Sequence, residues 1–204
     1  MISSVRADAF IETPGLPGGP AARLQVRKAA MHDIAPILDL INGYAAKGIM
    51  LPRTEFEMSE AIRDFTVATL DGALLGCGAL HFYSPSIGEI RSLAVAESAK
   101  THGVGRRVVE ALVAEAEDYD LDAVFAFTYV VEFFGRVGFH EVERGVLPLK
   151  AWKDCLRCPK FQACDEIAVL RVLRPERWSG PRGAAPAAWP GDEPLIQIPI
   201  PVNR

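Results

Sequence analysis

The residues best suited to bind an anion lie between Lys100 and Arg107, where two glycines precede a stretch with helically spaced apolar residues. Gly103 and Gly105 let the backbone approach a ligand closely, and the helix start adds free N–H groups and the positive end of its dipole. Lys100, Arg106 and Arg107 contribute formal positive charge. The pattern predicts a site for phosphate or pyrophosphate, with an ordinary capped helix as the alternative.

Two common nucleotide-binding motifs are absent from the sequence. A P-loop requires G-x-x-x-x-G-K-[ST], and a dinucleotide fingerprint requires G-x-G-x-x-G near the first strand of a parallel sheet. Only Gly103-x-Gly105 is present. The predicted anion site therefore belongs to neither class.

A carboxylate and a guanidinium precede this loop, at the strand-like run from Ile90 to Val95. Period-two alternation predicts two faces, Glu89, Arg91, Leu93 and Val95 on one and Ile90, Ser92 and Ala94 on the other. At such a position, Glu89 could take a proton from an attacking amine. The alternative is an ion pair with Arg91 or another base, which would leave Glu89 inert.

Three cysteines near the end of the folded region, Cys155, Cys158 and Cys164, are spaced C-x2-C-x5-C. They offer three thiolates, one fewer than a closed zinc site requires, and Asp165, His140 or a water could complete the set. Three packed thiols or a redox-sensitive pair are the alternatives. A structural zinc is therefore one of several expectations for this segment.

Composition favours a soluble protein of one domain with tails. The chain has 204 residues, 50% of them hydrophobic, and a formal net charge of −4. The charge argues against a nucleic-acid partner, and no apolar run is long enough to span a membrane. Four cysteines without a signal peptide indicate a reducing compartment, so we expect a cytoplasmic protein. Cys77, beside glycines in a strand, is expected to fill the core.

Hydrophobic spacing and turn signals predict the elements that position these residues. Residues 1–22 are expected to form a flexible leader, 23–174 the domain, with the cysteines in its 150–166 segment, and 175–204 a Pro- and Gly-rich tail. The predicted order is strand 24–28, helix 34–45, helix 55–63, strands 65–70, 73–83 and 90–95, helix 103–118, strand 123–128, helix 131–137, and strands 139–142 and 167–173. Asp33 and Thr54 are expected helix caps, and Asp71-Gly72 an expected hairpin turn.

Two segments resemble signatures of the GNAT acetyltransferase superfamily. The loop is similar to [Q/R]-x-x-G-x-[G/A], with Lys100 where Gln or Arg is usual, and Phe133-Phe-Gly-Arg-Val-Gly138-Phe139 is similar to F-[FY]-x-x-x-G-F. The resemblance covers roughly residues 23–174 and implies the GNAT fold, an α/β (α+β) fold with a mixed, mostly antiparallel central sheet flanked by helices.

A finer resemblance rests on three further segments, Leu75-Gly-Cys-Gly-Ala-Leu-His81, Glu89-Ile-Arg-Ser-Leu and the cysteine segment. Together with the loop, they look like the short, single-domain N-acetylglutamate synthases of bacterial arginine synthesis. This implies an N-acetyltransferase that moves the acetyl group of acetyl-CoA directly to the α-amine of L-glutamate. Superfamily members are often dimers, so a homodimer is also expected.

The resemblance assigns roles to individual residues. Acetyl-CoA is expected to contact Leu93, Ala94, Val95, Lys100, Thr101, His102, Gly103, Val104, Gly105, Arg106, Phe133 and Phe134. The backbone N–H of Val95 is the expected donor to the thioester carbonyl, and Glu89 is the expected base. Phe134 stands where many members have a tyrosine that protonates the leaving thiolate. Tyr129 or water could take that role, with strand-end packing as the alternative for Tyr129.

An acceptor with two carboxylates needs cations, and arginine suits this because its guanidinium binds carboxylates in a bidentate manner. Arg53 and Arg91 are the main candidates, Lys47 is a third, and structural ion pairs are the alternative. A polyamine acceptor would instead need acidic residues such as Glu55, Glu57 and Glu60. A catalytically idle module that binds acetyl-CoA or zinc is the alternative from another functional class.

Overall fold

The computed structural model describes residues 9–12, 23–147, 158, 160 and 163–180. Its strands are β1 (Ala9–Glu12), β2 (Arg23–Lys28), β3 (Phe65–Leu70), β4 (Ala73–Phe82), β5 (Ile87–Val95), β6 (Ala123–Thr128), β7 (His140–Val142) and β8 (Ile167–Val172). Its α-helices are α1 (Ile34–Ala45), α2 (Glu55–Ala61), α3 (Val104–Asp118) and α4 (Val131–Arg136). Short 3-10 helices are η1 (Met31–Asp33), η2 (Ile62–Asp64), η3 (Glu97–Ala99) and η4 (Arg144–Val146).

The described strands form one sheet in the order β1-β2-β3-β4-β5-β6-β8-β7. Neighbouring strands are antiparallel except β5 and β6, which are parallel. The predicted mixed, mostly antiparallel sheet flanked by helices is therefore confirmed. Strand β1 was not predicted, because its four residues lie just before the Gly- and Pro-containing run 14–20, in a segment expected to be a flexible leader.

Local signals account for several boundaries. Asp71 and Gly72 both have positive φ, 49° and 81°, as a two-residue hairpin turn between right-twisted strands requires. The side chain of Thr54 accepts a hydrogen bond from the N–H of Glu57, and the Glu57 carboxylate accepts one from the N–H of Thr54. Asp33 was expected to cap α1, but its carboxylate accepts hydrogen bonds from Arg27 and from the N–H of Ala30. It therefore stabilises the start of η1 and makes no side-chain cap of α1.

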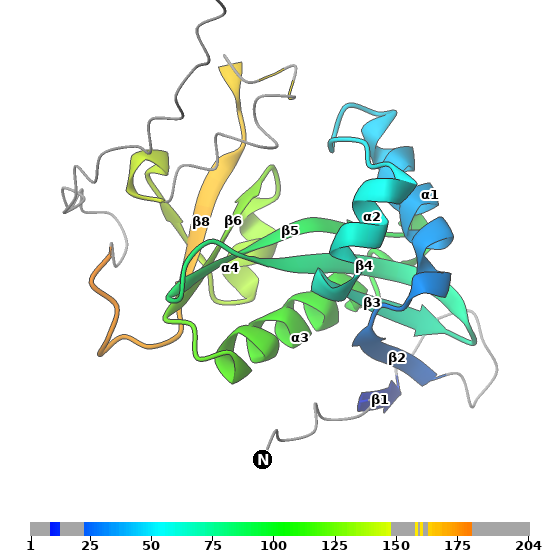
Figure 1. The fold of residues 1–204 in the computed structure, drawn as a ribbon, viewed down its shortest axis with the longest axis horizontal. Helices are drawn as coiled ribbons and strands as arrows, with labels where there is room; N and C mark the ends of the chain where they lie inside the picture. Colours follow the sequence, from blue (N-terminus) through cyan, green and yellow to red (C-terminus); the bar gives the residue numbers. More distant parts are fainter. Residues whose placement is uncertain (1–8, 13–22, 148–157, 159, 161–162, 181–204) are drawn as a thin grey trace, which may run out of the picture.

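Helices cover both faces of the sheet (Figure 1). One face packs on α3, through a core that includes Val104, Val108 and Leu112. The opposite face divides into two clusters. Helices α1 and α2 cover β3 and β4 through residues such as Ile37 and Met58, whereas Leu147, Trp178 and other residues pack on β6 and β8. No helix in the described part of the chain is long and apolar enough to cross a membrane.

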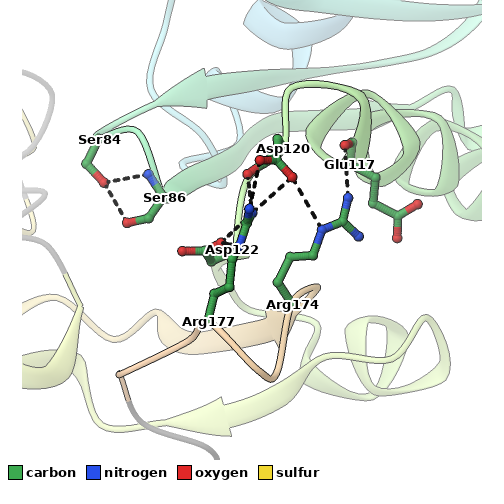
Figure 2. A network of polar contacts seen from close by, with 7 residues as sticks. All are labelled: Ser84, Ser86, Glu117, Asp120, Asp122, Arg174 and Arg177. Carbon is green, nitrogen blue, oxygen red and sulfur yellow. Dashed lines mark hydrogen bonds and ion pairs between the residues drawn. The ribbon is translucent and has the colours of Figure 1, made fainter.

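The chain that follows β8 is attached to the turn between α3 and β6 (Figure 2). The Arg177 guanidinium donates to the carboxylates of Asp120 and Asp122 at 2.8 and 2.7 Å and to the Asp120 carbonyl oxygen at 2.7 Å. Asp120 has a φ of 60°, and Arg177 lowers the pKa of its carboxyl through a hydrogen bond. Residues 174–178 therefore dock on the domain, although most of this segment belongs to the expected tail.

Candidate active site

A β-bulge shapes the central strand. The register passes from Cys77–Ala94 to Ala79–Arg91, so Ser92 and Leu93 lie opposite the single residue Gly78. Ser92 has a φ of 53°, in the left-handed region that non-glycine residues rarely adopt. The extra residue shifts the alternation of the strand by one position.

The prediction that Glu89, Arg91, Leu93 and Val95 share one face is therefore wrong. Ile90, Leu93 and Val95 pack in the α3 core, whereas Ala94 packs in the α1 cluster. Glu89 pairs with His81 across the ladder and Arg91 pairs with Ala79, a member of the α1 cluster. Glu89 and Arg91 both precede the bulge and lie together on the α1 face, and the bulge turns Leu93 and Val95 toward α3.

Strands β5 and β6 separate beyond Glu89. Their parallel ladder covers only Ile87–Glu89 with Ala123–Phe125, while β6 pairs with β8 along its full length. The N–H of Ala96 donates to the carbonyl of Leu75 at 2.8 Å, so the next pair, Gly76 with Val95, is a non-hydrogen-bonded pair. The N–H and carbonyl groups of Val95 consequently point away from β4. They face the other side of β5, where β6 no longer pairs with it.

The start of α3 has a left-handed glycine followed by backbone N–H groups of the first turn. Gly103 has a φ of 73°, and the N–H of Arg107 donates to its carbonyl oxygen at 3.1 Å. The N–H groups of Val104, Gly105 and Arg106 precede this first internal bond, and such groups are available to a ligand. A Cβ on Gly105 would lie 3.3 Å from Val95 and 3.5 Å from Phe133, so this glycine allows the helix start to pack closely on β5 and α4.

The basic side chains of the loop are engaged elsewhere. Lys100 binds Glu97 at 3.0 Å and lies 5.2 Å from the centre of the Tyr44 ring, and Arg106 binds Glu110 at 2.7 Å. The hydrogen bond with Glu97 raises the pKa of the Lys100 ammonium group, and the same bond lowers the pKa of Glu97. In this structure the groups of the loop that remain available to an anion are therefore mainly backbone N–H groups.

The remaining residues expected at acetyl-CoA differ in exposure. Thr101 is exposed and His102 half-buried. Phe133 is half-buried beside Gly105, but Phe134 is only 3% exposed and packs edge-on against Phe139 in the α3 core. This placement favours Phe133 over Phe134 as a contact for a ligand.

Glu89 is a buried carboxylate at the boundary between the two clusters of the α1 face. Its side chain is 1% exposed, and the Tyr83 hydroxyl donates to its Oε2 at 3.3 Å. Phe125, opposite Glu89 in the β5–β6 ladder, belongs to the cluster on β6 and β8, whereas Ala79 and Ala94 belong to the α1 cluster. Across the ladder, His81 Nδ1 lies 3.4 Å from an Asp64 oxygen. A buried carboxylate at this position can serve as a base once an amine is bound.

Two arginines lie on the same side as Glu89. The backbone of Arg53 is fixed by Asn42, which accepts from the Arg53 N–H at 2.9 Å and donates to the Arg53 carbonyl oxygen at 3.0 Å. The Arg53 guanidinium then reaches the bulge and donates to Ser92 Oγ at 3.3 Å. Because Ser92 follows Arg91 directly, the fold brings Arg53 from the α1–α2 loop to the strand that carries Glu89 and Arg91.

Tyr129 follows the last residue of β6. Its hydroxyl donates to Asp165 at 2.9 Å and accepts from the Lys160 ammonium at 3.1 Å. Burial raises the pKa of Tyr129. The hydrogen bond from Lys160 lowers this pKa and the hydrogen bond to Asp165 raises it, so that the net change is an increase. The phenol is therefore protonated at neutral pH, and in this structure its hydroxyl proton is directed to Asp165.

The cysteines give no support to the zinc expectation. Cys155 lies outside the described residues, and Cys158 and Cys164 are half-buried thiols. Within the described part of the chain, no cluster of three His, Cys, Asp or Glu residues could hold a metal ion. Cys77 is fully buried, and burial raises the pKa of its thiol to about 12, so it packs in the core as expected.

Three residues that hydrogen-bond to residues of the candidate site were not predicted from the sequence. Asn42 fixes Arg53, Tyr83 contacts Glu89, and the Tyr44 hydroxyl donates to the Val95 carbonyl oxygen at 2.6 Å. Each of these contacts joins separate elements or a strand with its turn, so sequence spacing held no signal for them. Gly78, opposite the bulge, was the only local hint of the altered strand.

Comparisons with known proteins agree with this geometry. Residues 38–141 match the Acetyltransferase (GNAT) family. The chain is 44% identical over 154 residues to an uncharacterized N-acetyltransferase of Chlorobaculum tepidum, a match that covers 76% of this chain and 99% of that protein. It is 40% identical over 121 residues to an amino-acid acetyltransferase of Mycobacterium tuberculosis, covering 58% of this chain and 69% of that protein.

A solved structure has the same fold. The N-acetylglutamate synthase from Neisseria gonorrhoeae, complexed with coenzyme A and N-acetyl-glutamate, matches with a TM-score of 0.67 and 29% identity. The match covers 74% of this chain and 35% of that one, so this chain corresponds to about a third of the longer protein. The family match and the overall similarity to the Chlorobaculum protein together establish that the chain belongs to the GNAT family of N-acetyltransferases.

Proposed function

We propose that this enzyme transfers the acetyl group of acetyl-CoA to the α-amine of L-glutamate, the first step of arginine biosynthesis. The observation that carries the proposal is the α1 face of β5, where Glu89 and Arg91 lie beside Arg53 of the α1–α2 loop. The similarity to an amino-acid acetyltransferase and to an N-acetylglutamate synthase supports an amino-acid acceptor.

The start of α3 fits the diphosphate of acetyl-CoA. Gly103 is exposed and left-handed, the first-turn N–H groups follow it, and the helix dipole favours an anion there. We assign the backbone from Thr101 to Arg106 to this diphosphate, and the β5 segment Leu93–Val95 to the arm that carries the thioester. Phe133, beside Gly105, completes this side of the site.

When bound, acetyl-CoA supplies an acetyl group that is activated as a thioester. Glu89 takes a proton from the acceptor amine, directly or through a water, which frees the nitrogen lone pair for attack. The Val95 N–H, directed away from β4, donates to the carbonyl oxygen as negative charge develops there. As the new C–N bond forms and the C–S bond breaks, Tyr129 gives a proton to the leaving thiolate. Lys160 then stabilises the Tyr129 oxygen.

The two arginines select an acidic amino acid. A guanidinium can bind a carboxylate through two parallel hydrogen bonds, and L-glutamate carries two carboxylates. Arg91 lies two residues after the proposed base on one strand, and the backbone of Arg53 is held by Asn42. We therefore assign one carboxylate of the acceptor to each arginine.

The test is release of free thiol from acetyl-CoA, with L-glutamate, other amino acids and polyamines assayed in parallel. We expect turnover with L-glutamate, and a strong decrease at subsaturating L-glutamate in Arg53→Ala and Arg91→Ala. Turnover with polyamines alone would discard the acidic acceptor and direct attention to Glu55, Glu57 and Glu60. Tight binding of coenzyme A without turnover on any acceptor would overturn the enzymatic proposal in favour of a binding module.

A further inference from the structure

The hydroxyl of Tyr83 is the feature of the site that the mechanism above leaves unused. It donates to Glu89 Oε2 at 3.3 Å from the turn that joins β4 to β5, while Glu89 itself is 1% exposed. We propose that Tyr83 is a positioning residue that orients the carboxylate of Glu89 toward the acceptor amine. This inference rests on the proposed role of Glu89 as the base, but it is independent of which amine is the acceptor.

The ring of Tyr83 is held on two sides. It lies edge-on to His81, with ring centres 5.3 Å apart and an interplanar angle of 89°, and is tilted by 55° against Phe125 at 5.5 Å. Phe125 is opposite Glu89 in the β5–β6 ladder, and His81 is opposite Glu89 in the β4–β5 ladder. The two strands that flank Glu89 thus both contact the tyrosine that binds it.

The turn itself fixes the backbone of Tyr83. Its N–H donates to the Ile87 carbonyl oxygen at 3.0 Å, and the N–H of Ser84 donates to the same oxygen at 3.2 Å. Ser84 Oγ accepts from the N–H of Ser86 at 3.2 Å, as Figure 2 shows. These hydrogen bonds fix the backbone of Tyr83 relative to Ile87. Because Glu89 is only two residues beyond Ile87, the turn holds the phenol close to the Glu89 carboxylate.

Orientation matters because the last torsion of a glutamate side chain is broad and only roughly two-fold. A hydrogen bond to one oxygen restricts that torsion, and the bond is stronger when the carboxylate is ionised and able to take a proton. His81 cannot replace this contact in the structure, since its Nδ1 faces Asp64. Within the described turn, Tyr83 is thus the residue that connects the backbone of the β4–β5 turn to Glu89, the proposed base.

The experiment compares Tyr83→Phe, Glu89→Gln and the double variant by thiol release, with melting temperature and coenzyme A affinity measured for each. The best acceptor of the wild-type enzyme is used. Phenylalanine keeps the ring contacts and removes only the hydroxyl. We expect Tyr83→Phe to lower kcat about 10-fold, a part of the 10²- to 10⁴-fold that acid–base catalysis contributes, with unchanged KM values and melting temperature. Tyr119→Phe, which removes the hydroxyl of a 63% exposed tyrosine, is the matched control and should leave kcat unchanged.

The double variant distinguishes positioning from a separate effect on the fold. If Tyr83 acts through Glu89, adding Tyr83→Phe to Glu89→Gln should lower the remaining activity less than about two-fold, because coupled residues are not additive. A full additional 10-fold loss, or an unchanged kcat in Tyr83→Phe, would overturn the proposal for Tyr83 alone. Full activity in Glu89→Gln would instead remove the base itself, and with it the function assigned to this face.

Discussion

The start of α3 and the α1 face of β5 differ in which atoms the proposed function assigns to ligand binding and catalysis. At α3, the proposed ligand groups are backbone N–H groups, while Lys100 and Arg106 form ion pairs with Glu97 and Glu110. On β5, the proposed groups are the side chains of Glu89 and Arg91, which precede the bulge and lie on one face. A backbone site depends on conformation and tolerates changes of side chain, whereas a side-chain site is lost with a single functional group.

The largest effect should come from the β5 face. Glu89→Gln keeps the size of the side chain but cannot accept the amine proton, so we expect kcat to fall by about 10²- to 10⁴-fold. Affinity for coenzyme A, measured by calorimetry, should remain unchanged because the start of α3 is intact. A parallel loss of coenzyme A binding would show that the two regions are not separate.

The next largest effect is expected at Arg91. Removing a charge-assisted pair with a carboxylate costs about 1.5–3 kcal/mol, so Arg91→Ala should raise the KM for L-glutamate by roughly 10- to 100-fold. Arg63, exposed in η2, offers a matched control in which the same substitution should leave KM unchanged. Equal effects of the two substitutions would mean that general surface charge, and not the β5 face, attracts the acceptor.

A substitution that strains the backbone at the start of α3 should weaken both stability and coenzyme A binding. Gly103 has a φ of 73°, and no atom lies within 4 Å of the position that a Cβ would occupy there, so Gly103→Ala adds backbone strain without a steric clash. We expect a loss of about 1–2 kcal/mol in the free energy of unfolding, together with weaker coenzyme A binding. Gly43→Ala, at an equally open position inside α1, should instead stabilise by roughly 0.5–1 kcal/mol. Urea unfolding of both variants checks the contrast.

The smallest effect is expected from a side chain of the α3 region. Lys100 forms an exposed ion pair with Glu97, and such pairs contribute about 0–1 kcal/mol. Lys100→Ala should therefore change the Kd for coenzyme A by less than about five-fold. A much larger change would show that Lys100 leaves Glu97 for the diphosphate, and that this site depends on side chains as well.

The contrast between the start of α3 and the α1 face of β5 also explains how much could be predicted from the sequence. Asp71-Gly72, the cap at Thr54 and the glycines before α3 are local signals, and the structure has the expected conformations at each. The faces of β5 could not be read from alternation, because the bulge at Ser92 depends on pairing with Gly78 of another strand. The contacts of Asn42 with Arg53 and of Tyr83 with Glu89 likewise arise only once distant elements or a closed turn bring them together.

The short ladder between β5 and β6 has a consequence for the order in which the chain can fold. Strand β6 has three register pairs with β5 and six with β8, and about 40 residues separate β6 from β8 in the sequence. During synthesis, β6 therefore leaves the ribosome well before its main partner. Non-local pairing of this kind slows folding and leaves an unpaired edge in the meantime. Because β6 pairs mainly with β8, this part of the sheet is completed only once β8 has been made.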